Sequence, residues 1–121
     1  MLNITINETH NTALLEPQGQ LTAKDFAAAV RIIDPYIEQH AKLHALIIAT
    51  EHFPGWDSFA ALLSHLQFVR DHHQKVNKVA IATNSLLGDF AQHLGAHFIH
   101  AEVKSFRYEQ REQAKIWAQS P

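Results

Sequence analysis

The chain contains no cysteine, so it has no disulfide, no thiolate nucleophile and no cysteine ligand for a metal. It has only 4 glycines, too few to build a glycine-rich phosphate-binding loop. Unbroken apolar runs such as 45–49 are far shorter than the ~20 residues of a membrane-spanning helix. These absences exclude a disulfide scaffold and predict neither a nucleotide-phosphate loop nor a membrane span.

Charge of either sign is also modest. The chain carries 10 Lys and Arg against 12 Asp and Glu, for a formal net charge of -2. A nucleic-acid partner normally needs a clustered basic face, so we expect no nucleic-acid binding. The first residues, Met1–Asn7, lack a basic segment followed by a long apolar core, so we expect no signal peptide and a cytoplasmic location.

Catalytic and metal-binding patterns are missing too. The sequence contains neither Gly-x-Ser-x-Gly nor His-Glu-x-x-His, so no catalytic residue is assigned and we expect a protein that is not an enzyme. There are 10 histidines, but their spacings do not favour a shared metal ion. His65 and His72 lie on one face of the expected helix, two turns apart, which is too distant for a chelating pair unless another element intervenes. His93 and His97, for example, are separated by Gly95, which should end a helix. We therefore predict no metal and no cofactor. The histidines could instead favour peripheral contact with acidic membrane at low pH.

The first forty residues predict a hairpin followed by a helix. Residues 2–7 alternate apolar and polar side chains, which is the period of a strand with one wet face, and 12–17 return antiparallel to them. Thr22 and Asp25 have the spacing of a helix cap, with Leu21 and Phe26 placed as a hydrophobic staple. Pro35 interrupts that helix, so it either kinks or gives way to a second helix.

The rest of the chain alternates strands and helices. We expect strands over 43–50, 78–83 and 97–103, and helices over 57–73, from 84 to Gly95, and over 108–119, the last burying Ala114 and Trp117. Strands separated by helices should be parallel, with right-handed crossovers. The prediction is therefore a single α/β domain over 1–121, with a mixed, mostly parallel sheet of about five strands, an N-terminal antiparallel hairpin and four or five flanking helices.

The segment 51–57 is the most informative candidate site. It places two large aromatic residues, Phe53 and Trp56, in a corner at the carboxyl end of the central strand, the edge where open α/β sheets usually bind ligands. The corner could be a hydrophobic plug, or the mouth of a site for an apolar small molecule, a lipid or the membrane surface. The predicted ligand-binding residues are Phe53, Trp56, Phe59, Leu62 and Leu63.

Four local motifs resemble the SpoIIAA-like family, small proteins with the fold of the sulfate-transporter and anti-sigma-factor-antagonist (STAS) domain. They are Phe53-x-Gly55-Trp56, Lys78-Val79-Ala80-Ile81, Ala101-Glu102-Val103 leading to Phe106, and Ala114-x-x-Trp117. The resemblance implies a STAS-like fold and a binding or regulatory role without catalysis.

Partner-switching antagonists of that wider fold carry a phosphorylatable serine at the start of the helix after the central strand. Ser58 occupies the matching place, but in the context Asp57-Ser58-Phe59-Ala60, without the second serine and the glycine. The alternative prediction is therefore a protein-partner regulatory module phosphorylated at Ser58. Tyr108 and Trp117 add apolar area to the last helix, and we expect a homodimer.

Overall fold

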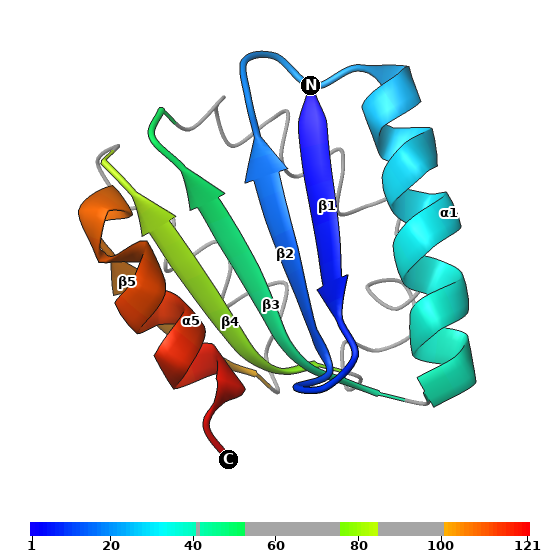
Figure 1. Cartoon of the computed structure of the whole chain (residues 1–121). Coiled ribbons are helices and arrows are strands. Elements are labelled where there is room, and N and C mark those ends of the chain that lie inside the picture. Colours follow the sequence, from blue (N-terminus) through cyan, green and yellow to red (C-terminus); the bar gives the residue numbers. More distant parts are fainter. Residues whose placement is uncertain (41, 53–75, 85–100) are drawn as a thin grey trace.

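The computed structural model describes residues 1–40, 42–52, 76–84 and 101–121. They form one five-stranded sheet with the strand order β1-β2-β3-β4-β5 (Figure 1). The strands are β1 (Leu2–Asn7), β2 (Thr12–Pro17), β3 (Leu43–Thr50), β4 (Val76–Thr83) and β5 (Glu102–Phe106). β1 pairs antiparallel with β2, and every other neighbouring pair is parallel. The predicted α/β class, mixed sheet and N-terminal hairpin are confirmed.

Two α-helices lie within the described residues, α1 (Ala23–His40) and α5 (Arg111–Gln119), together with a 3-10 turn, η1 (Tyr108–Gln110). Four or five helices were expected for the whole chain; the helix expected over 57–73 falls outside the described residues, and so does the one expected over 84–95, apart from Asn84. No helix of the described ranges is both long and apolar enough to cross a membrane.

The structure corrects several predicted boundaries. α1 continues through Pro35, so a second helix starting there is wrong; buried Ile33 and Ile37 on either side of Pro35 hold the helix against the core. β4 begins at Val76, not Lys78, because Val76 is buried and pairs with Leu43. The last strand was expected over 97–103, but β5 begins at Glu102 and ends at Phe106, because its pairing with β4 runs from Lys78 to Ala82; residues 97–100 lie outside the described residues. The final helix begins as the 3-10 turn η1.

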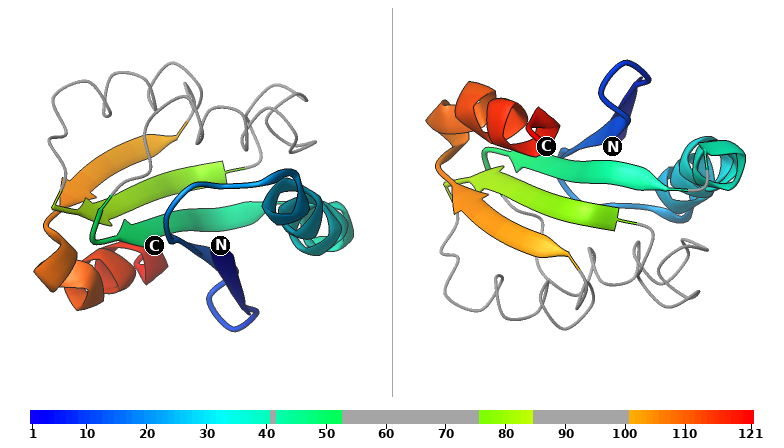
Figure 2. Two further views of the ribbon diagram at one scale, coloured as in Figure 1. Left: turned by 90° about the horizontal axis from the view of Figure 1, so that it is seen from above. Right: turned by 90° about the horizontal axis from the view of Figure 1, so that it is seen from below.

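The core has two parts, one on each face of the sheet. Alternate residues of a strand point to opposite faces, so Leu46 and Ile48 of β3 join the α1 side, whereas Ile47 and Ala49 join the α5 side. Figure 2 shows α5 lying across one face of the sheet. The α1 side is built from large aliphatic residues, and the α5 side is mostly alanine.

Alanines on both partners let α5 approach the sheet closely. Ala114 and Ala118 of α5 are fully buried against Ala45, Ala80 and Ala82. The prediction that this helix buries Ala114 is therefore confirmed. The prediction that the helix also buries Trp117 is wrong, because this residue is only partly buried. Its ring lies beside Phe106, with 6.1 Å between the ring centroids. The helix face turned to the sheet is set by Ala114 and Ala118, four residues apart.

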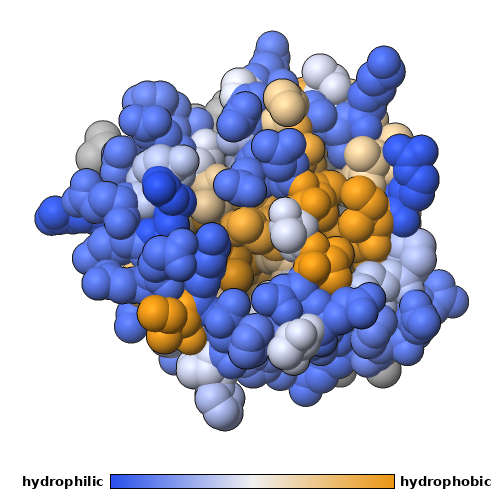
Figure 3. Space-filling model, in the orientation of Figure 1, coloured by the Kyte–Doolittle hydropathy of each residue, from blue (hydrophilic) through white to orange (hydrophobic). Residues whose placement is uncertain are grey.

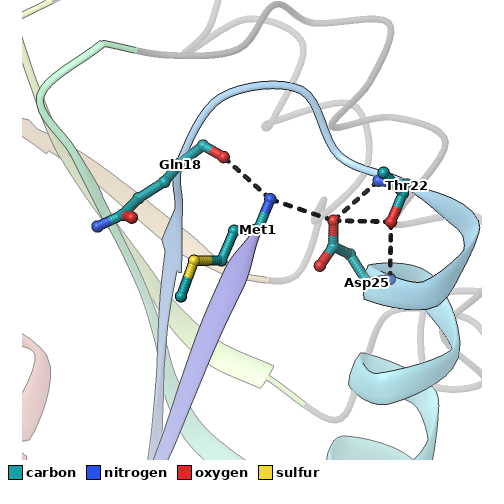
Figure 4. A network of polar contacts seen from close by, with 4 residues as sticks. All are labelled: Met1, Gln18, Thr22 and Asp25. Carbon is teal, nitrogen blue, oxygen red and sulfur yellow. Dashed lines mark hydrogen bonds and ion pairs between the residues drawn. The ribbon is translucent and has the colours of Figure 1, made fainter.

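The start of α1 is capped as its spacing predicts. The backbone N–H of Thr22 donates to Oδ2 of Asp25 at 2.8 Å, and the N–H of Asp25 donates to Oγ1 of Thr22 at 3.4 Å. The amino group of Met1 lies 3.3 Å from the same carboxylate and also donates to the carbonyl of Gln18 at 3.0 Å (Figure 4). This network attaches the first turn of α1 to the β1–β2 end of the sheet.

Replacing Asp25 with asparagine is expected to lower the free energy of unfolding at pH 7 by about 1 kcal/mol. The hydrogen bond from the Thr22 N–H, assisted by the Met1 amino group, lowers the pKa of Asp25. A carboxyl group with a lower pKa in the folded state stabilises above its unfolded pKa of about 3.9, and this contribution disappears as the pH falls through the folded pKa. Urea unfolding between pH 7 and pH 2 measures it.

The control is Glu38→Gln on the exposed side of the same helix, which should leave the pH profile unchanged. An Asp25→Asn variant whose stability falls between pH 5 and pH 2 as steeply as that of the parent protein would contradict the assignment.

Candidate functional site

β2 and β3 separate at their carboxyl ends. Their pairing ends at Leu15 and Ile48. Beyond that point Pro17 has no N–H to donate, and the N–H of Gln18 donates instead to the carbonyl of Met1 at 2.7 Å. Gly19 then turns the chain with a φ of 64°, a conformation that glycine adopts without strain. The end of β2 therefore follows β1 and leaves β3, which opens a space at the carboxyl edge of the sheet.

A cavity of about 260 Å³ fills this space. We call it the edge cavity. Its walls come from the end of β2, the end of β3 and the 3-10 turn after β5, and its described lining residues are Glu16, Pro17, Gln18, Gly19, Ala49, Thr50, Glu51, His52 and Tyr108. Carboxyl ends of parallel strands are the usual ligand-binding edge of an open α/β sheet. The position of the cavity therefore agrees with the edge that the sequence indicated.

The electrostatics of the edge cavity are acidic. Glu16 and Glu51 line it, and its described lining contains no lysine or arginine. Arg111 holds Tyr108 in place through two contacts. The guanidinium carbon of Arg111 lies 3.9 Å from the Tyr108 ring centroid, and Nη1 of Arg111 donates to the Tyr108 carbonyl at 3.1 Å. Oγ1 of Thr50 donates to the carbonyl of His52 at 3.0 Å, which fixes the chain just after β3.

The predicted site residues cannot be placed against this cavity. Phe53, Trp56, Phe59, Leu62 and Leu63 lie outside the described residues, as does Ser58. The described chain stops at His52, which lines the cavity and directly precedes Phe53 in the sequence. The aromatic corner and the phosphorylation of Ser58 stay predictions.

A second polar cluster, which sequence reasoning missed, joins β3 and β4 to the end of α5. Lys78 is only 8% exposed, and its Nζ donates to the Trp117 carbonyl at 3.1 Å, the Ser120 carbonyl at 3.0 Å and the Ser120 hydroxyl at 2.8 Å. Nε2 of His44 lies 2.7 Å from the same Ser120 carbonyl. Since a carbonyl only accepts, Nε2 carries the proton.

This cluster closes the end of α5. The last carbonyls of a helix have no partner within the helix and carry partial negative charge, and Lys78 supplies a cation there, with its Nζ 4.9 Å from the Trp117 ring centroid. The sequence signal was a lysine directly before the apolar run Val79–Ala82 of β4. Among the described residues, no three His, Asp or Glu side chains are placed to hold a metal ion.

Comparison with known proteins identifies the family of the chain. A family model described as SpoIIAA-like matches residues 14–119, which is most of the chain. No curated protein and no solved structure matches the chain. The matched range includes every described lining residue of the edge cavity. It also includes Lys78 and Trp117, which contact each other through a hydrogen bond and a cation–ring contact.

Proposed function

From the premise that this chain belongs to the SpoIIAA-like family, whose fold indicates a regulatory or binding module, we propose that it is a non-enzymatic binding module that takes a small amphipathic molecule at the edge cavity. The observation that carries this proposal is the separation of β2 from β3 after Leu15 and Ile48. That separation leaves about 260 Å³ of space at the edge of the sheet where α/β proteins usually bind ligands.

The lining favours a ligand with two different ends. Pro17, Ala49 and the ring of Tyr108 offer apolar contact, and the sequence continues from His52 into the predicted aromatic corner at Phe53 and Trp56. Glu16 and Glu51 disfavour an anionic head by charge repulsion. The proposed ligand therefore has an apolar chain and a neutral or zwitterionic head, as a fatty alcohol or a lysolipid does.

Titration with decanol, lysophosphatidylcholine and decanoate tests this proposal. Decanol and lysophosphatidylcholine, kept below their micelle concentrations, are expected to change the tryptophan fluorescence and to raise the melting temperature, and decanoate should bind more weakly. Tyr108→Ala removes one wall of the cavity and should weaken binding about fivefold, which corresponds to about 1 kcal/mol of lost ring contact.

The matched control is Ile116→Ala. Ile116 is 68% exposed and is not part of the cavity lining, so its removal should leave the affinity unchanged. If none of the three compounds binds at concentrations up to 1 mM, on the order of the weak limit for such ligands, the proposed function is wrong. Intact mass spectrometry of the freshly purified protein tests the alternative, phosphorylation of Ser58, separately.

A further inference from the structure

Within the described part of the chain, α5 covers only part of its face of the sheet. α5 packs on β3 and β4, and the β1–β2 hairpin extends beyond it (Figures 1 and 2). Figure 3, drawn from this side, shows apolar side chains gathered in the middle of the face and surrounded by hydrophilic ones. A groove of about 140 Å³ lies between α5 and the hairpin, which we call the hairpin groove. Among the described lining residues, none is shared with the edge cavity.

The floor of the hairpin groove is apolar and its walls are polar. Leu14 and Ile47 form the floor, and they belong to the same hydrophobic cluster as the buried alanines of α5. The remaining lining residues are Thr5, Asn7, Thr12, Lys115 and Gln119. An apolar floor beside a few convergent polar groups is the usual composition of a small-molecule site.

Thr12 gives the groove a second, independent sign of a ligand. Its side chain is only 3% exposed and lines the groove. Its hydroxyl makes no hydrogen bond with any other residue of the described chain, although buried polar groups are almost always paired. A buried hydroxyl without a partner costs about 1–3 kcal/mol, so a partner supplied from outside the chain would relieve that cost.

Lys115 sets the charge of the site. It is the one charged residue in the described lining. Its Nζ pairs with Glu112 at 3.4 Å, but that carboxylate is 83% exposed, so the pair is weak and readily exchanged. A carboxylate entering the groove can accept hydrogen bonds from the ammonium of Lys115, the hydroxyl of Thr12 and the side-chain amide of Gln119.

We propose that the hairpin groove binds a short-chain organic carboxylate, with its carboxylate between Lys115 and Thr12 and its alkyl part on Leu14 and Ile47. The volume limits the ligand, since about 140 Å³ is the room of roughly four to five waters at about 30 Å³ each. This site is separate from the proposed function, because its ligand is a small anion and the edge cavity is lined by carboxylates.

Butyrate is the probe, with butanol and butylammonium as chain-matched comparisons without the negative charge. Butyrate is expected to shift the backbone amide resonances of Thr12, Leu14 and Gln119, with a dissociation constant on the order of 1 mM. Butanol and butylammonium should bind at least fivefold more weakly. Raising NaCl to 0.5 M should weaken butyrate binding by screening Lys115.

Two variants separate a ligand site from a structural role. Thr12→Val keeps the shape of the side chain and removes the hydroxyl; it should not lower the melting temperature, yet it should weaken butyrate binding about fivefold. Lys115→Gln should weaken binding by a similar factor and abolish the salt dependence. Lys104→Gln, an exposed lysine outside the groove, is the control and should change the affinity less than twofold.

The proposal is wrong if butyrate at 20 mM, far above the expected dissociation constant of about 1 mM, leaves the groove resonances unshifted. It is equally wrong if butanol binds as tightly as butyrate. Unchanged butyrate affinity in Thr12→Val would show that the hydroxyl is satisfied by bound water and would also overturn it. None of these outcomes bears on decanol or lysolipid binding at the edge cavity.

Discussion

Replacing Leu46 with alanine is expected to lower the free energy of unfolding by about 3 to 4 kcal/mol and the melting temperature by about 10–15 °C. Leu46 is fully buried in the central strand β3. It pairs with Ala13 of β2 on one side and Val79 of β4 on the other. The removed methyl groups leave a cavity in the middle of the sheet, where strands paired on both sides cannot shift to fill it.

Urea unfolding followed by circular dichroism measures this loss. Ile116→Ala is the control, because a side chain that is 68% exposed should contribute no more than about 0.5 kcal/mol. Leu46→Met, which keeps most of the volume, should cost less than about 1.5 kcal/mol. A loss below about 1 kcal/mol for Leu46→Ala would mean that the α1 side of the core is not close-packed around β3.

Replacing Lys78 with methionine is expected to lower the free energy of unfolding by about 2 kcal/mol. Methionine keeps most of the aliphatic stem, so the change isolates the ammonium group. Without it, the carbonyls of Trp117 and Ser120 lose the donor that lies 3.1 Å and 3.0 Å away, and the cation at the negative end of α5 is gone. In this variant the backbone amides of α5 should exchange with solvent faster than in the parent protein, and this increase should be larger than for the amides of β3.

Lys104→Met is the matched control. Lys104 also lies over an aromatic ring, with Nζ 5.9 Å from the Trp117 ring centroid, but it is exposed on β5. Its replacement should change stability by less than about 0.5 kcal/mol. If Lys78→Met is as stable as the parent protein, the cost of burying the charge cancels its hydrogen bonds, and the cluster does not hold α5 to the sheet.

Local patterns in the sequence determined most of the secondary structure described here. The alternation over 2–7 predicted β1, the apolar run 43–50 predicted β3 with its bounds, and the spacing of Thr22 and Asp25 predicted the cap of α1. These signals are short-range, because side-chain period and capping depend on residues within a few positions of one another. The predicted strand bounds were wrong where pairing with a neighbour extended a strand, as at Val76 and Phe106.

The sites were decided by tertiary structure. Glu16 and Tyr108 are far apart in the sequence and line one cavity only because β2 leaves β3 and the chain returns after β5. Thr12 and Lys115 likewise meet at one groove because α5 lies across the sheet beside the hairpin. The sequence by itself determined the α/β order of elements and indicated the carboxyl edge of the sheet as the candidate ligand-binding edge. Which distant polar groups converge, and which buried group lacks a partner, follows from packing between elements that no local pattern encodes.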